Sequence, residues 1–120
     1  MPRKNNSEWT TDIVLIDIIN FSKLEAKHQV EIINFLTKSY TKMIEKMLEN
    51  SNMPLSSLIL GYISTGDGFY CILNPKLKGY GTILGLSFNY ISEHIAKKYS
   101  YFQGLRIAVH TGKIDRKSVV

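Results

Sequence analysis

Short apolar runs alternate with longer amphipathic stretches along this chain. Runs of strand length cover residues 12–18, 58–63, 69–73 and 105–110. Over residues 22–50 and 79–99, apolar positions instead recur every three or four residues, which is the spacing of amphipathic helices. The order β-α-β-β-α-β predicts an α+β domain with the ferredoxin-like arrangement, an antiparallel sheet with its helices on one face.

Local signals suggest where these elements begin and end. Ser22, followed three residues later by Glu25, has the pattern of a capping box, so we expect the first helix to begin at Ser22. Asn74-Pro75 is expected to close the third strand, and Thr111-Gly112 to form the turn after the last one.

Composition is that of one globular domain. The chain has 120 residues, of which 44% are hydrophobic, enough for a core. We expect a polar arm over residues 1–10, the domain over 11–114 and a tail over 115–120. No apolar run approaches the ~18 residues of a membrane span, and the first residues lack a signal-peptide pattern, so we expect a cytoplasmic protein without a membrane partner.

The net charge of +5 favours anionic partners such as nucleotides, but only weakly. Many lysines fall on the polar faces of the predicted helices, where solvation is the ordinary explanation. Cys71, the single cysteine, lies in a predicted strand and is expected to be a small buried hydrophobe.

Two aspartates stand out from this pattern. Asp17 is the only charged residue in the apolar stretch 13–19, where a carboxylate must be neutralised, hydrogen-bonded or bound to a cation. Asp67 lies in Gly66-Asp67-Gly68 between two strands, a strong hairpin pattern because glycine supplies positive φ. Taken alone, Asp67 is also typical of an ordinary turn residue.

The predicted topology brings these two aspartates together. In a right-handed split βαβ unit, the strand after the hairpin lies beside the first strand and runs antiparallel to it. The start of the Phe69 strand then abuts the end of the Asp17 strand, and both carboxylates converge on one edge of the sheet. Because hard divalent cations prefer oxygen ligands, the pair predicts a divalent metal site.

Three segments together resemble the catalytic domain of the class III nucleotidyl cyclases, the adenylyl and guanylyl cyclases. Residues 14–22 are similar to the family's first strand and turn, in which an Asp-Ile pair is followed by Gly-Phe-Thr/Ser. Residues 64–69 are similar to its hairpin, and residues 105–112 to its Leu-Arg-Ile-Gly-Ile-His-Thr-Gly strand. The segments follow the family's order and spacing over residues 12–114.

This resemblance implies a chemistry. Asp17 and Asp67 would hold two Mg²⁺ or Mn²⁺ ions, with the backbone carbonyl of Ile18 as a further ligand. The backbone amides implied to bind the triphosphate are those of Ile19, Asn20, Phe21 and Ser22. The reaction would convert a nucleoside triphosphate into a 3′,5′-cyclic nucleotide and pyrophosphate, at sites between the subunits of a head-to-tail homodimer.

The sequence departs from the family at two places. Ile63 stands at the base-reading position, where the family has Lys or Glu, and can offer only shape, so ATP, GTP, CTP and UTP all stay open. Stand-alone bacterial pyrimidine cyclases of antiphage signalling are one type that this allows. Beyond Gly112, Lys113, Arg116 and Lys117 do not match the family's Asn and Arg, which orient the ribose and stabilise the transition state. Loss of such groups typically costs roughly 10²-fold in rate.

Three functions are therefore weighed on sequence alone. The first is a metal-dependent nucleotidyl cyclase or its metal-binding core, and the second is an inactive cyclase-like regulatory or dimerisation module. The third, a ferredoxin-like nucleic-acid-binding domain, is disfavoured because Tyr62, Phe69 and Tyr70 lack the surrounding motif of RNA-recognition domains. Arg106 is equally consistent with a structural ion pair and with a phosphate contact, whereas His110 is expected to be structural.

Overall fold

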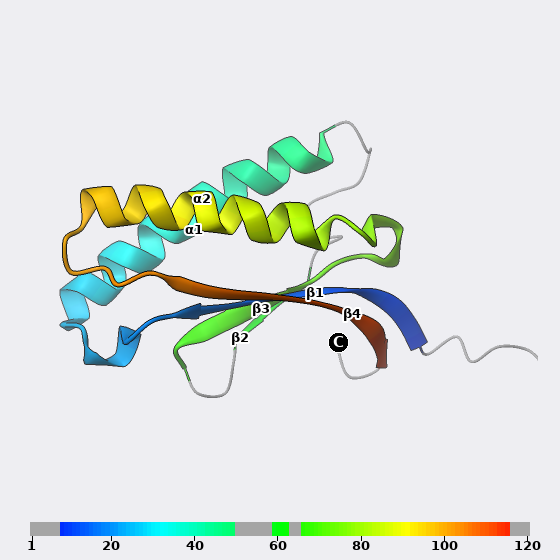
Figure 1. The fold of residues 1–120 in the computed structure, drawn as a ribbon, viewed down its shortest axis with the longest axis horizontal. Helices are drawn as coiled ribbons and strands as arrows, with labels where there is room; N and C mark the ends of the chain where they lie inside the picture. The colour runs from blue at the N-terminus through cyan, green and yellow to red at the C-terminus, as the bar shows by residue number, and fades with distance from the viewer. Residues whose placement is uncertain (1–7, 50–58, 63–65, 116–120) are drawn as a thin grey trace, which may run out of the picture.

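The structure, a computed structural model, describes residues 8–49, 59–62 and 66–115 (Figure 1). Within these residues the strands form one sheet in the order β2-β3-β1-β4. The strands are β1 (Glu8–Ile18), β2 (Ile59–Tyr62), β3 (Gly68–Ile72) and β4 (Leu105–Asp115). The helices are α1 (Ala26–Leu48), α2 (Gly81–Lys98) and the short 3₁₀ helices η1 (Phe21–Lys23) and η3 (Pro75–Leu77). Both α-helices lie on the same side of the sheet (Figure 1).

Strand β1 lies in the middle of the sheet and pairs antiparallel with both β3 and β4. The predicted hairpin is also present, because β2 pairs antiparallel with β3 and Tyr62 stands opposite Phe69. The prediction that the strand after the hairpin lies beside the first strand is therefore confirmed. The α+β class and the antiparallel sheet are confirmed with it.

The core lies between the sheet and the helices. Alternate residues of β1 face the helices, since side chains along a strand point to opposite sides. Phe88 of α2 is fully buried and contacts the rings of Tyr40 and Phe69. The other fully buried apolar side chains include Val14, Ile16, Ile32, Cys71, Leu73, Leu84 and Ile95. Burial of each large apolar side chain stabilises the fold by about 1.5–3 kcal/mol.

Asp12 is a charged residue inside this core, with only 2% of its surface exposed. Its Oδ2 accepts hydrogen bonds from the backbone amides of Gly79 (2.7 Å) and Gly81 (2.8 Å), and its Oδ1 accepts one from Thr111 Oγ1 (2.7 Å). Burial acts to raise the pKa of Asp12, but the hydrogen bonds from Thr111, Gly81 and Gly79, with Lys78 nearby, outweigh it and hold the pKa below its usual value. Because Gly81 is the first residue of α2, the Asp12 carboxylate, which belongs to β1, caps the N-terminus of that helix.

The start of α1 differs from the prediction. The helix begins at Ala26 rather than Ser22, so the predicted capping box is wrong. Ser22 lies in η1, and Glu25 is the N-cap residue but makes no side-chain cap hydrogen bond. The break lies after η1, because Leu24 (ψ of 153°) and Glu25 (ψ of 150°) are extended and separate η1 from α1.

The ends of β1 and β4 also differ from the prediction. Strand β4 continues to Asp115, so Thr111 and Gly112 are not a turn but stand opposite Asp12 and Thr11 of β1. Strand β1 begins at Glu8, so residues 8–10 of the predicted arm belong to the sheet. The remaining parts of the predicted arm and tail, residues 1–7 and 116–120, lie outside the described residues.

Candidate functional site

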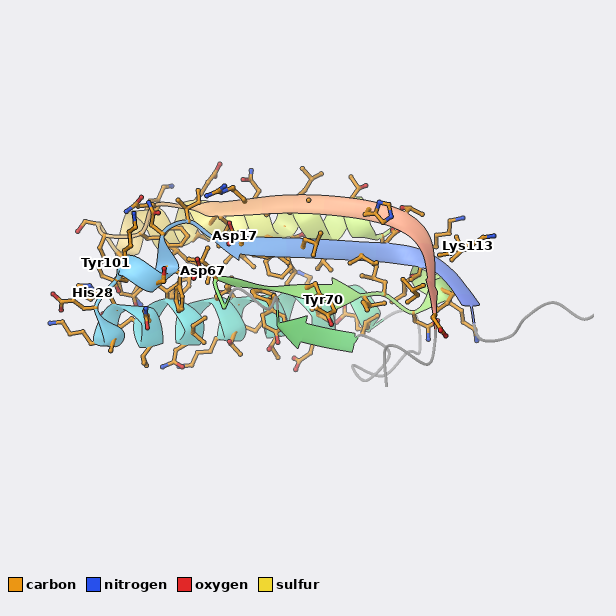
Figure 2. All side chains as sticks on the ribbon, turned by 90° about the horizontal axis from the view of Figure 1, so that it is seen from below. Asp17, His28, Asp67, Tyr70, Tyr101 and Lys113 are labelled. Atoms are coloured by element: carbon orange, nitrogen blue, oxygen red, sulfur yellow. The ribbon has the colours of Figure 1, made fainter. Side chains whose placement is uncertain are left out.

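The segments that carry Asp17 and Asp67 lie side by side at one end of the sheet (Figure 2). Asp17 of β1 stands directly opposite Gly68 of β3. The amide of the next residue, Ile18, donates a hydrogen bond of 2.8 Å to the backbone carbonyl of Asp67. The fold therefore brings together two acidic residues that are far apart along the chain.

The two glycines around Asp67 have different roles. Gly66 has φ of 81°, a conformation that a turn needs and that side-chain-bearing residues rarely adopt. Gly68 lies so close to β1 that an added Cβ would be 2.2 Å from the carbonyl oxygen of Ile16. Glycine at 66 thus permits the turn, and glycine at 68 permits the close approach that brings Asp67 next to the end of β1.

Asp17 is neither buried nor unpaired. Its side chain is 37% exposed, and its Oδ2 lies 3.5 Å from Nε of Arg106, which stands directly opposite on β4. Because Ile16 and Ile18 are buried on the helix side, the alternation along β1 places Asp17 on the sheet face away from the helices. An ion pair this exposed contributes about 0–1 kcal/mol, so it leaves Asp17 accessible to a competing cation.

The turn after β1 supplies three of the four backbone amides expected to bind phosphate. The amide of Ile19 is already used, because it donates to the carbonyl of Gly104 (3.0 Å). The amides of Asn20, Phe21 and Ser22 have no acceptor within the described part of the chain. A left-handed residue followed by right-handed ones turns successive amides toward a common concavity, which is a known anion-binding geometry.

This turn is held in place by contacts that no sequence pattern indicated. The side-chain amide of Asn20 donates to Oε1 of Gln103 (2.7 Å), and Gln29 Nε2 donates to the carbonyl of Phe21 (2.9 Å). Both partners come from other elements, α1 and the loop before β4. His28 of α1 stacks on the ring of Tyr101, with centroids 3.7 Å apart (Figure 2).

The structure says less about the base-reading position and the further metal ligands. Ile63 lies outside the described residues, so the base-reading position has no structural description. Among residues 8–49, 59–62 and 66–115, no group of three or more His, Cys, Asp or Glu side chains could hold a metal ion. A cation at Asp17 and Asp67 would therefore need backbone oxygens and water as further ligands, as Mg²⁺ commonly does.

Comparison with known proteins adds no family assignment. No protein-family model and no curated protein matches this chain. None of the described helices combines the length and the apolar character needed to cross a membrane. The basis for a functional proposal is therefore the set of residues at the end of β1.

Proposed function

We propose that this chain is a metal-dependent nucleotidyl cyclase, or the metal-binding core of one, that forms a 3′,5′-cyclic nucleotide and pyrophosphate from a nucleoside triphosphate. The observation that carries this proposal is the position of Asp67 beside Asp17 at the end of β1. The strand order β2-β3-β1-β4 supports it, because this is the order of the ferredoxin-like fold to which we assign the chain.

The donor set fits Mg²⁺ or Mn²⁺. Asp17 and Asp67 offer carboxylate oxygens, both side chains are partly exposed, and the Ile18 carbonyl is a further candidate ligand. Two divalent ions held there would supply the charge that lowers the pKa of the ribose 3′-hydroxyl and neutralises the pyrophosphate leaving group. The chain's own contribution is to hold Asp17, near the end of β1, beside Asp67, which directly precedes β3.

The turn over Asn20, Phe21 and Ser22 is the proposed contact for the phosphates. Its three amides have no acceptor within the described part of the chain, and they come three to five residues after Asp17. Backbone amides oriented in this way bind anionic oxygens without the entropic cost of fixing a long side chain. Arg106, with 69% of its side chain exposed, is close enough to Asp17 to contact a phosphate bound nearby.

The proposed homodimer is supported by an apolar strip on the sheet face away from the helices. Leu15 of β1 is 37% exposed, and its cross-strand neighbours are Tyr70 and Ala108. A second copy that covers this strip would place its surface next to Asp17 on the same face. Sedimentation of Leu15→Lys against the unchanged chain tests this part, since a lysine there should favour the monomer.

A second function is favoured by one observation. Arg106 already neutralises Asp17 in part, so the carboxylate has a role without any metal. The chain would then be an inactive cyclase-like module that uses the same fold for regulation or dimerisation. This alternative predicts weak metal binding and no turnover.

Metal binding is the first test. Mn²⁺ is titrated into the full chain and its binding is measured by calorimetry. We expect Mn²⁺ to bind, and its affinity to fall at least about tenfold in Asp17→Asn and in Asp67→Asn. Glu45→Gln, which removes an exposed carboxylate on α1, is the matched control and should bind like the unchanged chain. Equal affinity in all four proteins would refute a metal site at Asp17 and Asp67.

Turnover is the second test and separates the two functions. Each of the four nucleoside triphosphates is incubated with the chain and Mn²⁺, and pyrophosphate release is measured. Release that is lost in Asp67→Asn supports the cyclase. Weak metal binding without release of pyrophosphate from any of the four supports the inactive module.

A further inference from the structure

The outer face of the helix layer carries a hollow that is lined by lysines. It has a volume of about 430 Å³ and lies between α1 and the C-terminal end of α2. A volume of this size is within the range of small-molecule sites. Lys38 and Lys42, one turn apart on α1, line one side of the hollow, and Lys98 at the end of α2 lines another.

The positive charge in this hollow is largely uncompensated. Lys38, Lys42 and Lys98 have no ion-pair partner among the residues that the structure describes. Among the described residues that line the hollow, Glu31 is the only carboxylate, and its Oε1 already accepts a hydrogen bond from Tyr101 Oη (3.0 Å). Three ammonium groups around one concavity repel each other, and an anion with at least two charges would relieve that repulsion.

The other lining residues describe the rest of the ligand. Asn34 and Ser39 offer side-chain hydrogen-bonding groups, whereas Phe35 and Tyr99 form an aromatic wall. The ammonium of Lys98 lies 5.1 Å from the centroid of the Phe35 ring and 5.6 Å from that of Tyr99, which holds this lysine beside that wall. The two rings pack edge to face, so the hollow combines multiple cations with aromatic surface in two orientations.

We propose that the hollow lined by Lys38, Lys42 and Lys98 binds an organic phosphate with at least two negative charges. Lysine is a point-charge donor suited to phosphate oxygens, and the edge-to-face rings of Phe35 and Tyr99 offer apolar contact for the organic part. The hollow lies in the helix layer, whereas Asp17 lies on the opposite face of the sheet, so the two sites are separate. A bound phosphate would connect α1 to the end of α2 and so stabilise their packing.

The test uses the full chain in EDTA, which keeps divalent ions away from the carboxylate pair. Inorganic tripolyphosphate and adenosine triphosphate are titrated by calorimetry and by thermal shift. We expect both to bind and to raise the melting temperature. The double variant Lys38→Gln/Lys42→Gln should weaken both affinities at least about tenfold. Binding that persists in EDTA separates this proposal from the proposed metal site, because the lysine-lined hollow needs no divalent ion.

The matched control removes the same charge elsewhere on the same two helices. Lys27→Gln/Lys97→Gln changes one exposed lysine on each helix that does not line the hollow, and it should leave the affinities within about twofold. Equal weakening in both double variants would show a general charge effect and overturn the proposal, as would the absence of binding at millimolar ligand. Tighter binding of oligoglutamate than of tripolyphosphate would also overturn it, in favour of an acidic protein segment.

Discussion

Replacement of Asp12 tests whether a buried carboxylate joins β1, α2 and β4. In Asp12→Asn, the side-chain oxygen can still accept from Gly79 and Gly81, and the amide can donate to Thr111 Oγ1. The three hydrogen bonds then become neutral ones. Hydrogen bonds to a charged group contribute about 1.5–3 kcal/mol each and neutral ones about 0.5–1.5, so about 3 kcal/mol is lost in total.

Part of this loss is offset because a neutral amide is less costly to bury than a carboxylate. We therefore expect Asp12→Asn to lower the free energy of unfolding by about 2 kcal/mol, or the melting temperature by about 10 °C. Asp12→Ala should be worse, by about 3–5 kcal/mol in total, because the buried amide of Gly81 is left without an acceptor.

The contribution of Asp12 to the free energy of unfolding should depend on pH, and the shift of its pKa gives the direction. The pKa of Asp12 in the folded chain lies below the value of 3.8 that applies when it is unfolded. Its ionised form therefore stabilises the fold fully above that value, and the contribution is lost as the pH falls through the folded pKa. The difference between the unchanged chain and Asp12→Asn should consequently narrow at low pH.

The assay is urea unfolding followed by circular dichroism at pH 7 and at pH values below 4. Glu45→Gln, an exposed carboxylate, is the control and should change the stability by less than about 0.5 kcal/mol. Thr111→Ser keeps the hydroxyl that donates to Asp12, so it should be nearly as stable as the unchanged chain. If Asp12→Asn matches the unchanged chain at pH 7, or if the difference stays constant at low pH, the capping role of Asp12 is wrong.

Three further predictions follow from packing. Gly68→Ala should destabilise the fold by at least about 2 kcal/mol in urea unfolding, because its Cβ would lie 2.2 Å from the Ile16 carbonyl oxygen; unchanged stability would show that β3 does not approach β1 this closely. Phe88→Ala should cost about 3–5 kcal/mol in the same assay, since the ring is fully buried, and a loss below about 1 kcal/mol would contradict its central place in the core. Burial raises the pKa of Cys71 to about 12, so a disulfide reagent should label this thiol only as urea unfolds the chain, and fast labelling of the folded chain would show that it is exposed.

The periodicity of the sequence determined the kinds of element and their order. Apolar residues recur every second position in a strand and every third or fourth position in a helix. This spacing is a local property, so it can be recognised in the sequence without knowledge of the fold. The hairpin around Asp67 was predictable for the same reason, because its two glycines are adjacent to it in the sequence. The pairing of β1 with β3, and with it the meeting of Asp17 and Asp67, followed from the handedness of the connection.

Tertiary structure decided the features whose partners are distant in sequence. Thr111-Gly112 has the local pattern of a turn, but pairing with β1 keeps it in the strand. Ser22 has the pattern of a helix cap, but it lies in η1, whose turn is held by hydrogen bonds from Asn20 to Gln103 and from Gln29 to Phe21. The extended Leu24 and Glu25 then delay α1 to Ala26. A local preference amounts to about 1 kcal/mol, which a few tertiary hydrogen bonds exceed.

The same reason applies to the charged residues. Asp12 reads as an ordinary strand start, yet its partners lie 67 to 99 positions further along the chain. In the sequence, Lys38 and Lys42 have the pattern of a solvated helix face. In the structure, the end of α2 places Lys98 across the same hollow. What a charge does depends on the charges and hydrogen bonds around it, and for these residues only the folded chain brings those groups together.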